Sequence, residues 1–249
     1  MTLHPLSERF AEVAEVYERG RAAYAPAVVG AIAAELGLAP GARVLDLGAG
    51  TGKLTRALLE FGLDVVAVEP LESMRDLLAA KVGAERVLDG RAEQIPLPDA
   101  SVAAVTAADA FHWFDQPAAL AEIRRVLRPG GGLAVSSAMP DWGGASWADE
   151  VGKLMEKLRP EHPGIEGPWW QDTLRGLGGW TEPREISVIT AHPATPERFL
   201  DFIGSVSWVA AMPANERADT LSRIQKLVAD GETPEQMRVH VNVGLTSLV

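Results

Sequence analysis

Residues 44–53 read VLDLGAGTGK, and this stretch decides the fold. Residues 42–47 have the length and apolar composition of a buried strand, and the leucines at positions 54, 58 and 59 have the spacing of an amphipathic helix that follows it. Three glycines at alternate positions join the two elements. Glycine adopts positive φ angles easily and lets a ligand approach the main chain, because it has no Cβ. The stretch therefore predicts a ligand site where a strand ends and a helix begins.

The spacing of these glycines distinguishes between two kinds of ligand. A dinucleotide site requires a glycine at position 53, where Lys53 stands, and this disfavours a nicotinamide-dependent oxidoreductase. Gly48, Gly50 and Gly52 follow Asp46 in a pattern that resembles motif I of the class I S-adenosylmethionine-dependent methyltransferases. The resemblance implies S-adenosyl-L-methionine as the cofactor, with these four residues at its site. The free amide groups at the start of the helix suit the carboxylate of its methionine part.

The composition limits the class of protein. The chain has 249 residues, of which 47% are hydrophobic, enough for one α/β domain over residues 1–249. The absence of cysteine fits a reducing compartment. A net charge of −11 disfavours nucleic acid and anionic membranes as partners. The first residues lack a basic segment followed by an apolar core, so we expect a cytoplasmic protein. We also expect either a monomer or a homodimer.

A carboxylate follows the second predicted strand. Residues 64–68 are apolar after the first position, and Glu69 comes directly after them. In doubly wound folds, an acid at this place accepts hydrogen bonds from both ribose hydroxyls of the cofactor. Pro70 and Met74 belong to the next predicted helix, over residues 70–82, and we assign both to the cofactor site. Met74 is a candidate for the adenine face, although a methionine at this position also fits plain core packing.

The adenine end is predicted from a second resemblance. Residues 90–99 read GRAEQIPLPD and resemble the family segment G-D-A-E-x-L-P-F-x-D, which places a carboxylate near the adenine amino group. Arg91 stands where the family has that aspartate, so the contact is assigned to Glu93 or to the backbone of Ala92. A short third strand is predicted at residues 86–88. Ala103, in the fourth predicted strand at residues 101–108, likewise replaces a family aspartate.

The fourth predicted strand, residues 101–108, leads into a loop at the face where α/β sheets bind their ligands. We expect Ala108 and Asp109 to border the cofactor. His112 lies on the same loop, residues 109–115, and is the candidate catalytic base if the acceptor is a hydroxyl or an amine. A histidine that only shapes the pocket is the alternative. We assign the neighbouring Trp113 to the acceptor site.

The remaining chain completes the predicted architecture. Residues 127–131 read LRPGG, which resembles the family's L-x-P-G-G signature before a fifth strand at 133–137. Strands are predicted at 184–190 and 237–245, with helices at 196–209 and 214–229 between them. The motifs at 40–140 imply a Rossmann-like class I methyltransferase fold: a seven-stranded, mostly parallel sheet with an antiparallel last strand and helices on both faces. Residues 1–24 and 196–229 are expected to form a helical cap.

The N-terminal segment supplies the candidate acceptor contacts. Residues 7–19 have the apolar spacing of one helix. Residues 17–26 resemble a Y-x-x-x-R-P-x-Y-P segment found ahead of motif I in the small-molecule subgroup that includes trans-aconitate methyltransferase-like proteins. The match is partial, because Ala22 replaces the first proline. It implies that Tyr17, Arg21 and Tyr24 contact the acceptor. Arg21 is positioned either to clamp an acceptor carboxylate or to bind the cofactor's carboxylate.

These resemblances imply methyl transfer from S-adenosylmethionine to a small-molecule acceptor, at the oxygen of a hydroxyl or carboxylate or else at nitrogen or carbon. The protein's main task is then alignment of the reacting atoms in a site that excludes water. No metal is predicted, because the five histidines are dispersed. A domain that binds the cofactor without transferring its methyl group is the alternative. Tryptophans gather in the second half of the chain, where they fit either a pocket lining or core packing.

Overall fold

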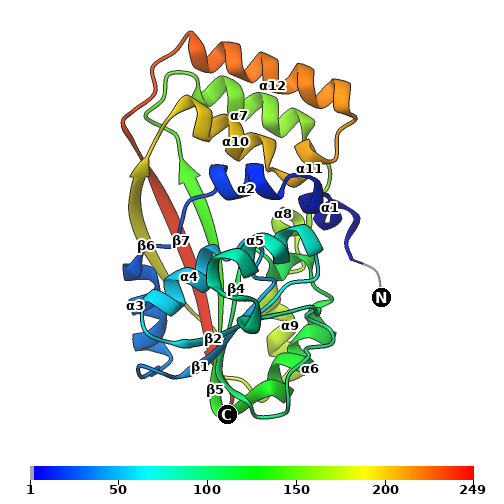
Figure 1. The fold of residues 1–249 in the computed structure, drawn as a ribbon, viewed down its shortest axis with the longest axis vertical. Coiled ribbons are helices and arrows are strands. Elements are labelled where there is room, and N and C mark those ends of the chain that lie inside the picture. Colours follow the sequence, from blue (N-terminus) through cyan, green and yellow to red (C-terminus); the bar gives the residue numbers. More distant parts are fainter. Residues whose placement is uncertain (1–2) are drawn as a thin grey trace.

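The computed structural model describes residues 3–249, and its centre is a seven-stranded sheet with the strand order β3-β2-β1-β4-β5-β7-β6 (Figure 1). The strands are β1 (Arg43–Leu47), β2 (Asp64–Val68), β3 (Val87–Leu88), β4 (Val102–Ala108), β5 (Leu127–Asp141), β6 (Arg184–Pro193) and β7 (Gln236–Ser247). β7 is antiparallel to both of its neighbours, and the remaining adjacent pairs are parallel. The predicted class I methyltransferase architecture is confirmed.

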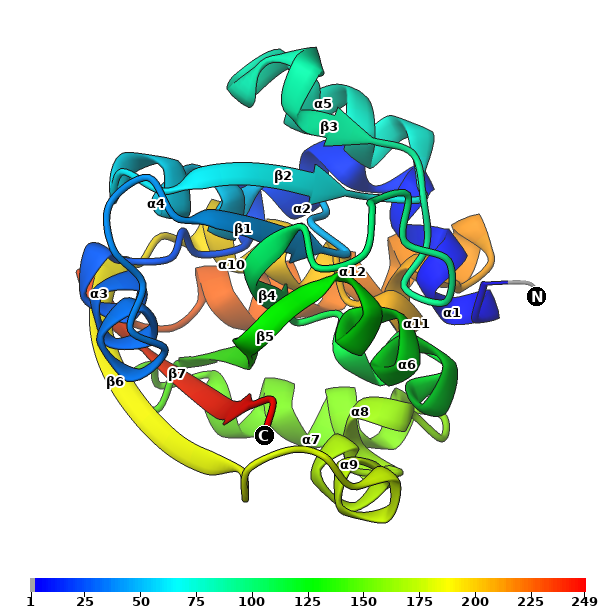
Figure 2. The ribbon, with the colours of Figure 1, turned by 90° about the horizontal axis from the view of Figure 1, so that it is seen from below.

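Successive side chains of the central strands point to opposite faces of the sheet, and helices cover the apolar side chains on both faces. The main flanking helices are α3 (Pro26–Glu35), α4 (Lys53–Glu60), α5 (Glu72–Val82), α6 (Gln116–Val126) and α9 (Trp170–Leu177). Val44 and Val65 pack with α3 and α4 in one hydrophobic cluster, whereas Leu45 and Val66 pack with α6 and α9 in the other. Figure 2 shows the sheet between these two sets of helices. Because β1 and β2 are buried on both faces, their buried positions are apolar except for Asp46.

A second group of helices lies beyond the carboxyl ends of the parallel strands, at the top of Figure 1. This group contains α2 (Ala14–Gly20), α7 (Ala148–Leu158), α10 (Pro196–Gly204), α11 (Ser207–Ala210) and α12 (Ala214–Ala229). The helices α10 to α12 are inserted between β6 and β7, as predicted. The helix α7 comes from the β5–β6 connection and was not predicted as part of this group. Trp147, just before α7, packs on Phe199 of α10 with ring centroids 4.2 Å apart.

Two predicted helices are wrong in detail, and both errors affect the site. Residues 7–19 do not form one helix, because the backbone leaves helical geometry at Val13 (φ −127°). The segment is divided into α1 (Pro5–Glu8), the 3₁₀ turn η1 (Arg9–Glu12) and α2. Residues 196–209 are likewise two helices, because Ser205 ends α10 by donating its hydroxyl hydrogen to the carbonyl of Phe202. Residues 1–2 of the predicted cap lie outside the described residues.

Three further short elements complete the chain, namely η2 (Ala84–Arg86), η3 (Phe111–Trp113) and α8 (Pro163–Glu166). The sequence patterns did not predict α8 or α9. The strand β5 is longer than the predicted 133–137, because it pairs with β7 from Gly132 to Asp141. A long antiparallel partner, distant in sequence, therefore sets its length.

The contact between α2 and α10 leads to a stability prediction. A Cβ at Gly20 would lie 2.4 Å from the backbone nitrogen of Phe202. Gly20→Ala must therefore separate the two helices, and we expect it to lower the free energy of unfolding by about 1–3 kcal/mol. Thermal melting of the purified protein measures this loss.

Gly30 provides the matched control within α3. A Cβ there would meet only Phe61 Cε2, at an ordinary 3.7 Å. Because alanine loses less backbone entropy than glycine in a helix, we expect Gly30→Ala to raise stability by up to about 1 kcal/mol. Equal melting temperatures for the two variants would contradict the tight α2–α10 contact.

Candidate active site

A cavity of about 610 Å³ opens at the carboxyl edge of the parallel strands. Gly48, Glu69 and Asp109, which directly follow β1, β2 and β4, line it together with Ser136 of β5. Its volume lies within the range of small-molecule sites. A second, smaller cavity of about 40 Å³ adjoins it, and the two share several lining residues, including Asp109.

Most of the predicted site residues lie together. Those that line the large cavity are Tyr17, Arg21, Gly48, Gly50, Glu69, Pro70, Met74, Ala92, Glu93, Ala108, Asp109, His112 and Trp113. The N-terminal segment and the ends of β1, β2 and β4 therefore converge on one space. Asp46, Gly52 and Tyr24 are not among the residues that line this cavity.

Asp46 and Gly52, which were predicted at the cofactor site, lie behind the loop rather than in the cavity lining. The Asp46 side chain is 1% exposed and accepts hydrogen bonds from Thr55 Oγ1 at 2.6 Å and Thr106 Oγ1 at 3.1 Å. It joins β1 to α4 and β4 beneath the loop. Gly52 caps α4, and a Cβ on it would lie 2.5 Å from Leu78 Cδ1. Both residues shape the glycine loop from behind.

Glu69 and Gly50 form the contact that defines this end of the cavity. The Gly50 amide donates to Glu69 Oε2 at 2.8 Å, and the Leu71 amide donates to Oε1 at 3.0 Å. Each carboxylate oxygen keeps a second acceptor site, because an ionised carboxylate has about four lone-pair positions. A Cβ on Gly50, whose φ is +56°, would meet no atom within 4 Å. The loop therefore presents bare backbone to the cavity beside a carboxylate.

Burial raises the pKa of two carboxyl groups at this loop, that of Asp46 to about 6 and that of Glu69 to about 7, despite the hydrogen bonds that both accept. Folding therefore raises both pKa values above those of the unfolded chain. At pH values between the unfolded and the folded pKa of each group, the native state binds more protons than the unfolded state. This contribution to stability is fully present below the unfolded values of 3.8 and 4.5 and is lost as the pH rises through 6 and 7.

The two carboxyl groups favour the ligand-free folded state at pH 5 over pH 8, by roughly 1–3 kcal/mol each across this interval. Burial lowers the pKa of His112 and of His162, which opposes this trend because the unfolded chain binds their protons at pH 5. We therefore expect the double variant Asp46→Asn, Glu69→Gln to lower the melting temperature at pH 5 relative to that at pH 8, compared with the parent. Glu185→Gln, which changes an exposed carboxylate, should keep the parent's difference between the two pH values. An unchanged pH dependence in the double variant would contradict the assignment.

Asp109 connects the two cavities. It has φ +51°, which is strained for a residue with a side chain. Its Oδ2 accepts from the Tyr24 hydroxyl at 3.1 Å, and its Oδ1 accepts from the Ala138 amide at 3.0 Å. Burial raises the pKa of Asp109, and the charge of Arg21 opposes that rise. Tyr24, which was predicted to contact the acceptor, therefore lies behind Asp109, at the small cavity.

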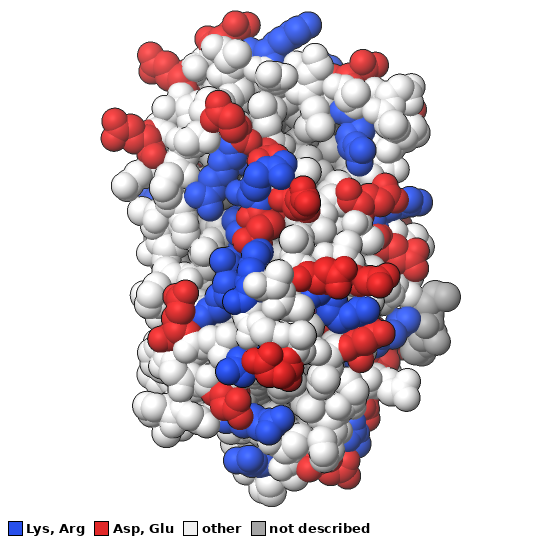
Figure 3. Space-filling model, viewed as in Figure 1, with Lys and Arg blue, Asp and Glu red and all other residues white. Residues whose placement is uncertain are grey.

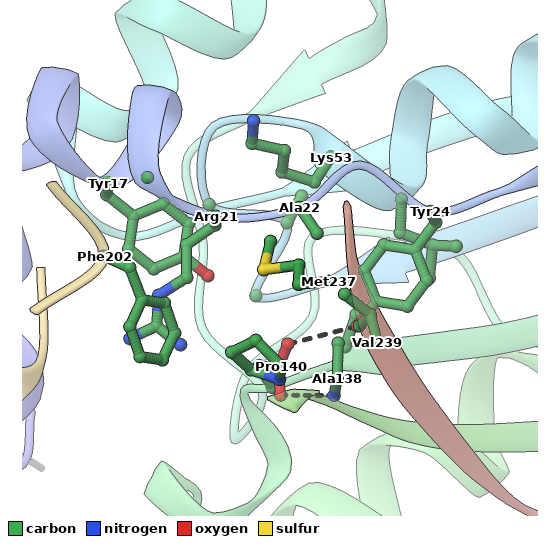
Figure 4. Close-up of a pocket in the computed structure, with 17 residues that line it drawn as sticks. Tyr17, Arg21, Ala22, Tyr24, Lys53, Ala138, Pro140, Phe202, Met237 and Val239 are labelled. Carbon is green, nitrogen blue, oxygen red and sulfur yellow. Dashed lines mark hydrogen bonds between the residues drawn. The ribbon is translucent and has the colours of Figure 1, made fainter. Parts of the chain in front are cut away.

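Arg21 lies between two aromatic rings. Its guanidinium carbon is 5.1 Å from the centroid of Tyr17 and 4.7 Å from that of Phe202, and Figure 4 shows the three side chains together. Its Nε donates to Ser205 Oγ at 3.1 Å. Cation–π contacts and this hydrogen bond fix the guanidinium at the cavity wall. Phe202 and Ser205 belong to the α10 region, which the sequence patterns did not connect with Arg21.

A carboxylate of α2 holds the glycine loop from outside. Glu18 Oε1 lies 2.8 Å from Lys81 Nζ and 3.1 Å from Arg56 Nη2, and Oε2 accepts from Thr51 Oγ1 at 2.5 Å. Lys53 Nζ donates to the Glu18 carbonyl at 2.6 Å, and burial lowers the pKa of Lys53 to about 8. The N-terminal helix is thereby fastened to the loop, to α4 and to α5.

The other end of the cavity is aromatic. His112 and Trp113 come from η3 with ring centroids 4.5 Å apart, and His162, the N-cap residue of α8, lies 5.5 Å from His112 and 4.8 Å from Trp113. Burial, followed by the charge of His162, lowers the pKa of His112 to about 3. His112 is therefore a neutral imidazole at neutral pH.

The sequence patterns missed part of this wall. Phe10, His162, Phe202 and Trp208 line the cavity, and none of them belongs to a motif. The predicted cap over 1–24 and 196–229 contains three of these residues without singling them out, and the cluster of tryptophans divides evenly. Trp169, Trp170 and Trp208 line the cavity, whereas Trp142, Trp147 and Trp180 are absent from its lining and pack in the hydrophobic clusters.

Residues 3–249 contain neither a helix that is long and apolar enough to cross a bilayer nor a cluster of three or more metal-ligating side chains.

Comparison with known proteins places this geometry in a family. The Methyltransferase domain family matches residues 45–135. An uncharacterized methyltransferase of Mycobacterium tuberculosis is 39% identical over 226 residues, which cover 90% of this chain and 87% of the relative. A malonyl-[acyl-carrier protein] O-methyltransferase of Serratia marcescens is 40% identical over 99 residues, or 39% of each chain. A solved structure of a candidate type II methyltransferase from Anaeromyxobacter dehalogenans has 26% identity and a TM-score of 0.60, covering 91% of this chain and 97% of that one. By fold, motif I and relatedness over most of its length, the chain belongs to the class I S-adenosylmethionine-dependent methyltransferases.

Proposed function

We propose that this methyltransferase transfers the methyl group of S-adenosylmethionine to the hydroxyl oxygen of a small molecule. The observation that carries the proposal is the single cavity that joins the Gly50–Glu69 contact at one end to His112 and Trp113 at the other. The Serratia relative is an O-methyltransferase, which favours oxygen as the acceptor atom. Figure 3 shows acidic and basic side chains interspersed over one face of the molecule, a pattern that favours a small molecule over a nucleic acid.

The described residues fit the cofactor. The backbone at Gly50 is open to the cavity, and a ligand can approach it without meeting a Cβ. Glu69 would accept from the two ribose hydroxyls with the lone pairs that its backbone contacts leave free. Met74 and Ala92 would flank the adenine, and Glu93, whose Oε1 accepts from the Asp115 amide at 3.0 Å, would lie at its edge. When bound, the cofactor supplies a methyl group activated by a sulfonium.

The protein's own residues would align the acceptor and receive its proton. His112 is neutral at physiological pH, so an imidazole lone pair is available to a hydroxyl donor. Arg21 would bind a carboxylate group, either that of the cofactor or one on the acceptor. Asp109, fixed by Tyr24 and Ala138, would lie between these two groups. Alignment in a space closed to water supplies most of the catalysis in such a displacement.

Residues 1–24 and 196–229 would cover this cavity. Tyr17, Phe202 and Trp208, from α2, α10 and α11, contribute to its lining. The bidentate contact from Arg19 to Asp201, at 2.8 and 2.9 Å, links the two segments. A cover that opens and closes would admit the acceptor and then exclude water.

Two measurements on the full chain test the proposed function. Calorimetry with S-adenosylmethionine should show binding, and transfer of a labelled methyl group to a panel of small hydroxyl compounds should yield methyl ethers. Binding without transfer to any panel member would favour a non-catalytic cofactor-binding protein. Binding of a nicotinamide dinucleotide in place of S-adenosylmethionine would overturn the cofactor assignment.

A further inference from the structure

Five aromatic side chains from four separate parts of the chain form one wall of the large cavity. This aromatic box consists of Phe10, His112, Trp113, His162 and Trp208. Its rings contact one another in series. Phe10 lies 5.9 Å from Trp113, and His162 packs edge-on against both Trp113 at 4.8 Å and Trp208 at 5.4 Å. Aromatic walls of this kind bind flat, apolar ligands.

Hydrogen bonds keep His162 in its neutral form. The Gly164 amide donates to His162 Nδ1 at 3.1 Å, so the ring hydrogen is on Nε2, which lies 3.2 Å from Ser207 Oγ. Burial also lowers the pKa of His162. Since His112 is neutral as well, the aromatic box carries no charge at neutral pH.

The entrance to the cavity has the same apolar character. Met139 is 61% exposed and Trp169 is 52% exposed, and both line the cavity together with the exposed Ile165. Exposed large apolar side chains that surround a cavity indicate an apolar ligand. Anionic ligands would meet an unfavourable field, because four carboxylates line the cavity against two guanidinium groups. These charged side chains are Glu69, Glu93, Asp109, Glu185, Arg21 and Arg91.

Both guanidinium groups already have protein partners. Arg91 Nε lies 3.3 Å from Glu93 Oε2, and Arg21 donates to Ser205 while its faces contact Tyr17 and Phe202. If Arg21 binds the carboxylate of the cofactor, the described lining residues leave only Arg91, which Glu93 holds, for an anionic acceptor. The charges therefore disfavour an anionic acceptor, and the apolar, uncharged box favours a neutral one.

The surroundings of His112 select among neutral hydroxyl compounds. Its nearest ring partners, Trp113 and His162, are uncharged and would not stabilise an imidazolium. A base in such surroundings is weak, so the acidity of the acceptor hydroxyl itself matters more. A phenol, with a pKa near that of tyrosine at about 10, needs less assistance from the base than an aliphatic alcohol, which is far less acidic.

We propose that the methyl acceptor is a neutral, planar aromatic compound bearing a phenolic or enolic hydroxyl, held in the aromatic box with that hydroxyl at His112. The inference rests on the proposed function and narrows its substrate class. The acceptor oxygen forms a bond to the methyl carbon while the carbon–sulfur bond breaks. The sulfur keeps the electron pair and becomes a neutral thioether, and the hydroxyl proton passes to the His112 imidazole.

Four compounds with one carbon skeleton test the substrate class. With the full chain and S-adenosylmethionine, methyl transfer is measured to 1-naphthol, decahydro-1-naphthol, 1-naphthoate and 1-naphthyl phosphate. We expect kcat/KM for 1-naphthol to exceed that for each of the others by at least 30-fold. A preference for 1-naphthoate or for the saturated alcohol would overturn the inference and leave methyl transfer itself in place.

Binding measurements separate the failure of the inference from that of the proposed function. Quenching of tryptophan fluorescence reports on 1-naphthol, and calorimetry reports on S-adenosylmethionine. Failure of the cofactor to bind would defeat the proposed function. The inference alone would be overturned if the cofactor binds and another hydroxyl compound is methylated, but 1-naphthol is not. This holds whether 1-naphthol fails to bind or binds without being methylated.

Variants of Trp208 test the aromatic box directly. Trp208→Ala should lower kcat/KM for 1-naphthol at least tenfold with cofactor affinity unchanged, and Trp208→Phe should restore most of it because a ring remains. Trp180→Ala, a tryptophan outside the cavity lining, should keep the parent's ratio of 1-naphthol to decahydro-1-naphthol turnover. Equal ratios in the parent, Trp208→Ala and Trp208→Phe would contradict the aromatic box as the acceptor site.

Discussion

Glu69→Ala is expected to weaken binding of S-adenosylmethionine by at least tenfold and to leave the protein folded. A hydrogen bond to a charged group is worth about 1.5–3 kcal/mol, which corresponds to roughly 10- to 150-fold in affinity. Glu69 would make two such bonds to the ribose. The variant also removes the acceptor of the Gly50 and Leu71 amides, so the glycine loop loses its anchor to the end of β2. Titration calorimetry at pH 8, where Glu69 is ionised, measures the effect.

Two further variants separate the ribose contact from other causes. Glu69→Gln keeps an oxygen that can accept from one amide but loses the charge, so we expect an intermediate affinity. Glu185→Ala removes a carboxylate that also lines the cavity and should bind the cofactor as the parent does. Because burial raises the pKa of Glu69 to about 7, the parent's affinity should also fall as the pH decreases from 8 to 6. If Glu69→Ala binds S-adenosylmethionine as tightly as the parent does, the assignment of the cofactor to this end of the cavity is wrong.

The cofactor end of the site was largely predictable from the sequence. In a parallel sheet, the residue after each strand lies at the same edge, so Gly48, Glu69 and Asp109 could be placed together from strand patterns alone. The exception is Asp46, whose position beside the glycines suggested contact with the cofactor. Its side chain points instead into the layer between β1 and α4, because residues on a strand alternate between faces.

The acceptor end was not predictable, because it is assembled by tertiary contacts. Phe10 reaches the cavity only because the expected helix over 7–19 breaks at Val13. His162 and Trp208 come from connections whose lengths and directions no local pattern specifies. Of the aromatic box, only His112 and Trp113, which follow a strand, were assigned from the sequence, and Tyr17 and Arg21 were assigned through the resemblance of residues 17–26. Hydrophobic periodicity predicts which inserted segments form helices. It does not predict where those helices pack, because that depends on how their surfaces fit the rest of the fold.

His112→Ala is expected to reduce kcat about 100-fold for a phenolic acceptor, with cofactor affinity unchanged. The range for a positioned base is about 10² to 10⁴, and the low end applies because the imidazole is a weak base in its uncharged surroundings. His112→Gln can accept a hydrogen bond from the hydroxyl but cannot take its proton, so it should be nearly as slow. Single-turnover rates at saturating cofactor and acceptor measure the chemical step. His192→Gln, on β6 and outside the cavity lining, is the control.

The pH dependence of the parent distinguishes a buried His112 from an ordinary one. A general base acts in its deprotonated form, and burial lowers the pKa of His112 to about 3, so the base is fully available from about pH 5 upward. At saturating substrates, kcat should therefore stay level between pH 5 and 7, while KM for the cofactor rises toward pH 5 as Glu69 takes up a proton. A decrease in kcat centred near pH 6.5, absent in His112→Gln, would show that His112 titrates as an exposed histidine. Turnover of His112→Ala within a few fold of the parent would leave His112 as part of the aromatic box, because the phenolic hydroxyl would then lose its proton without it.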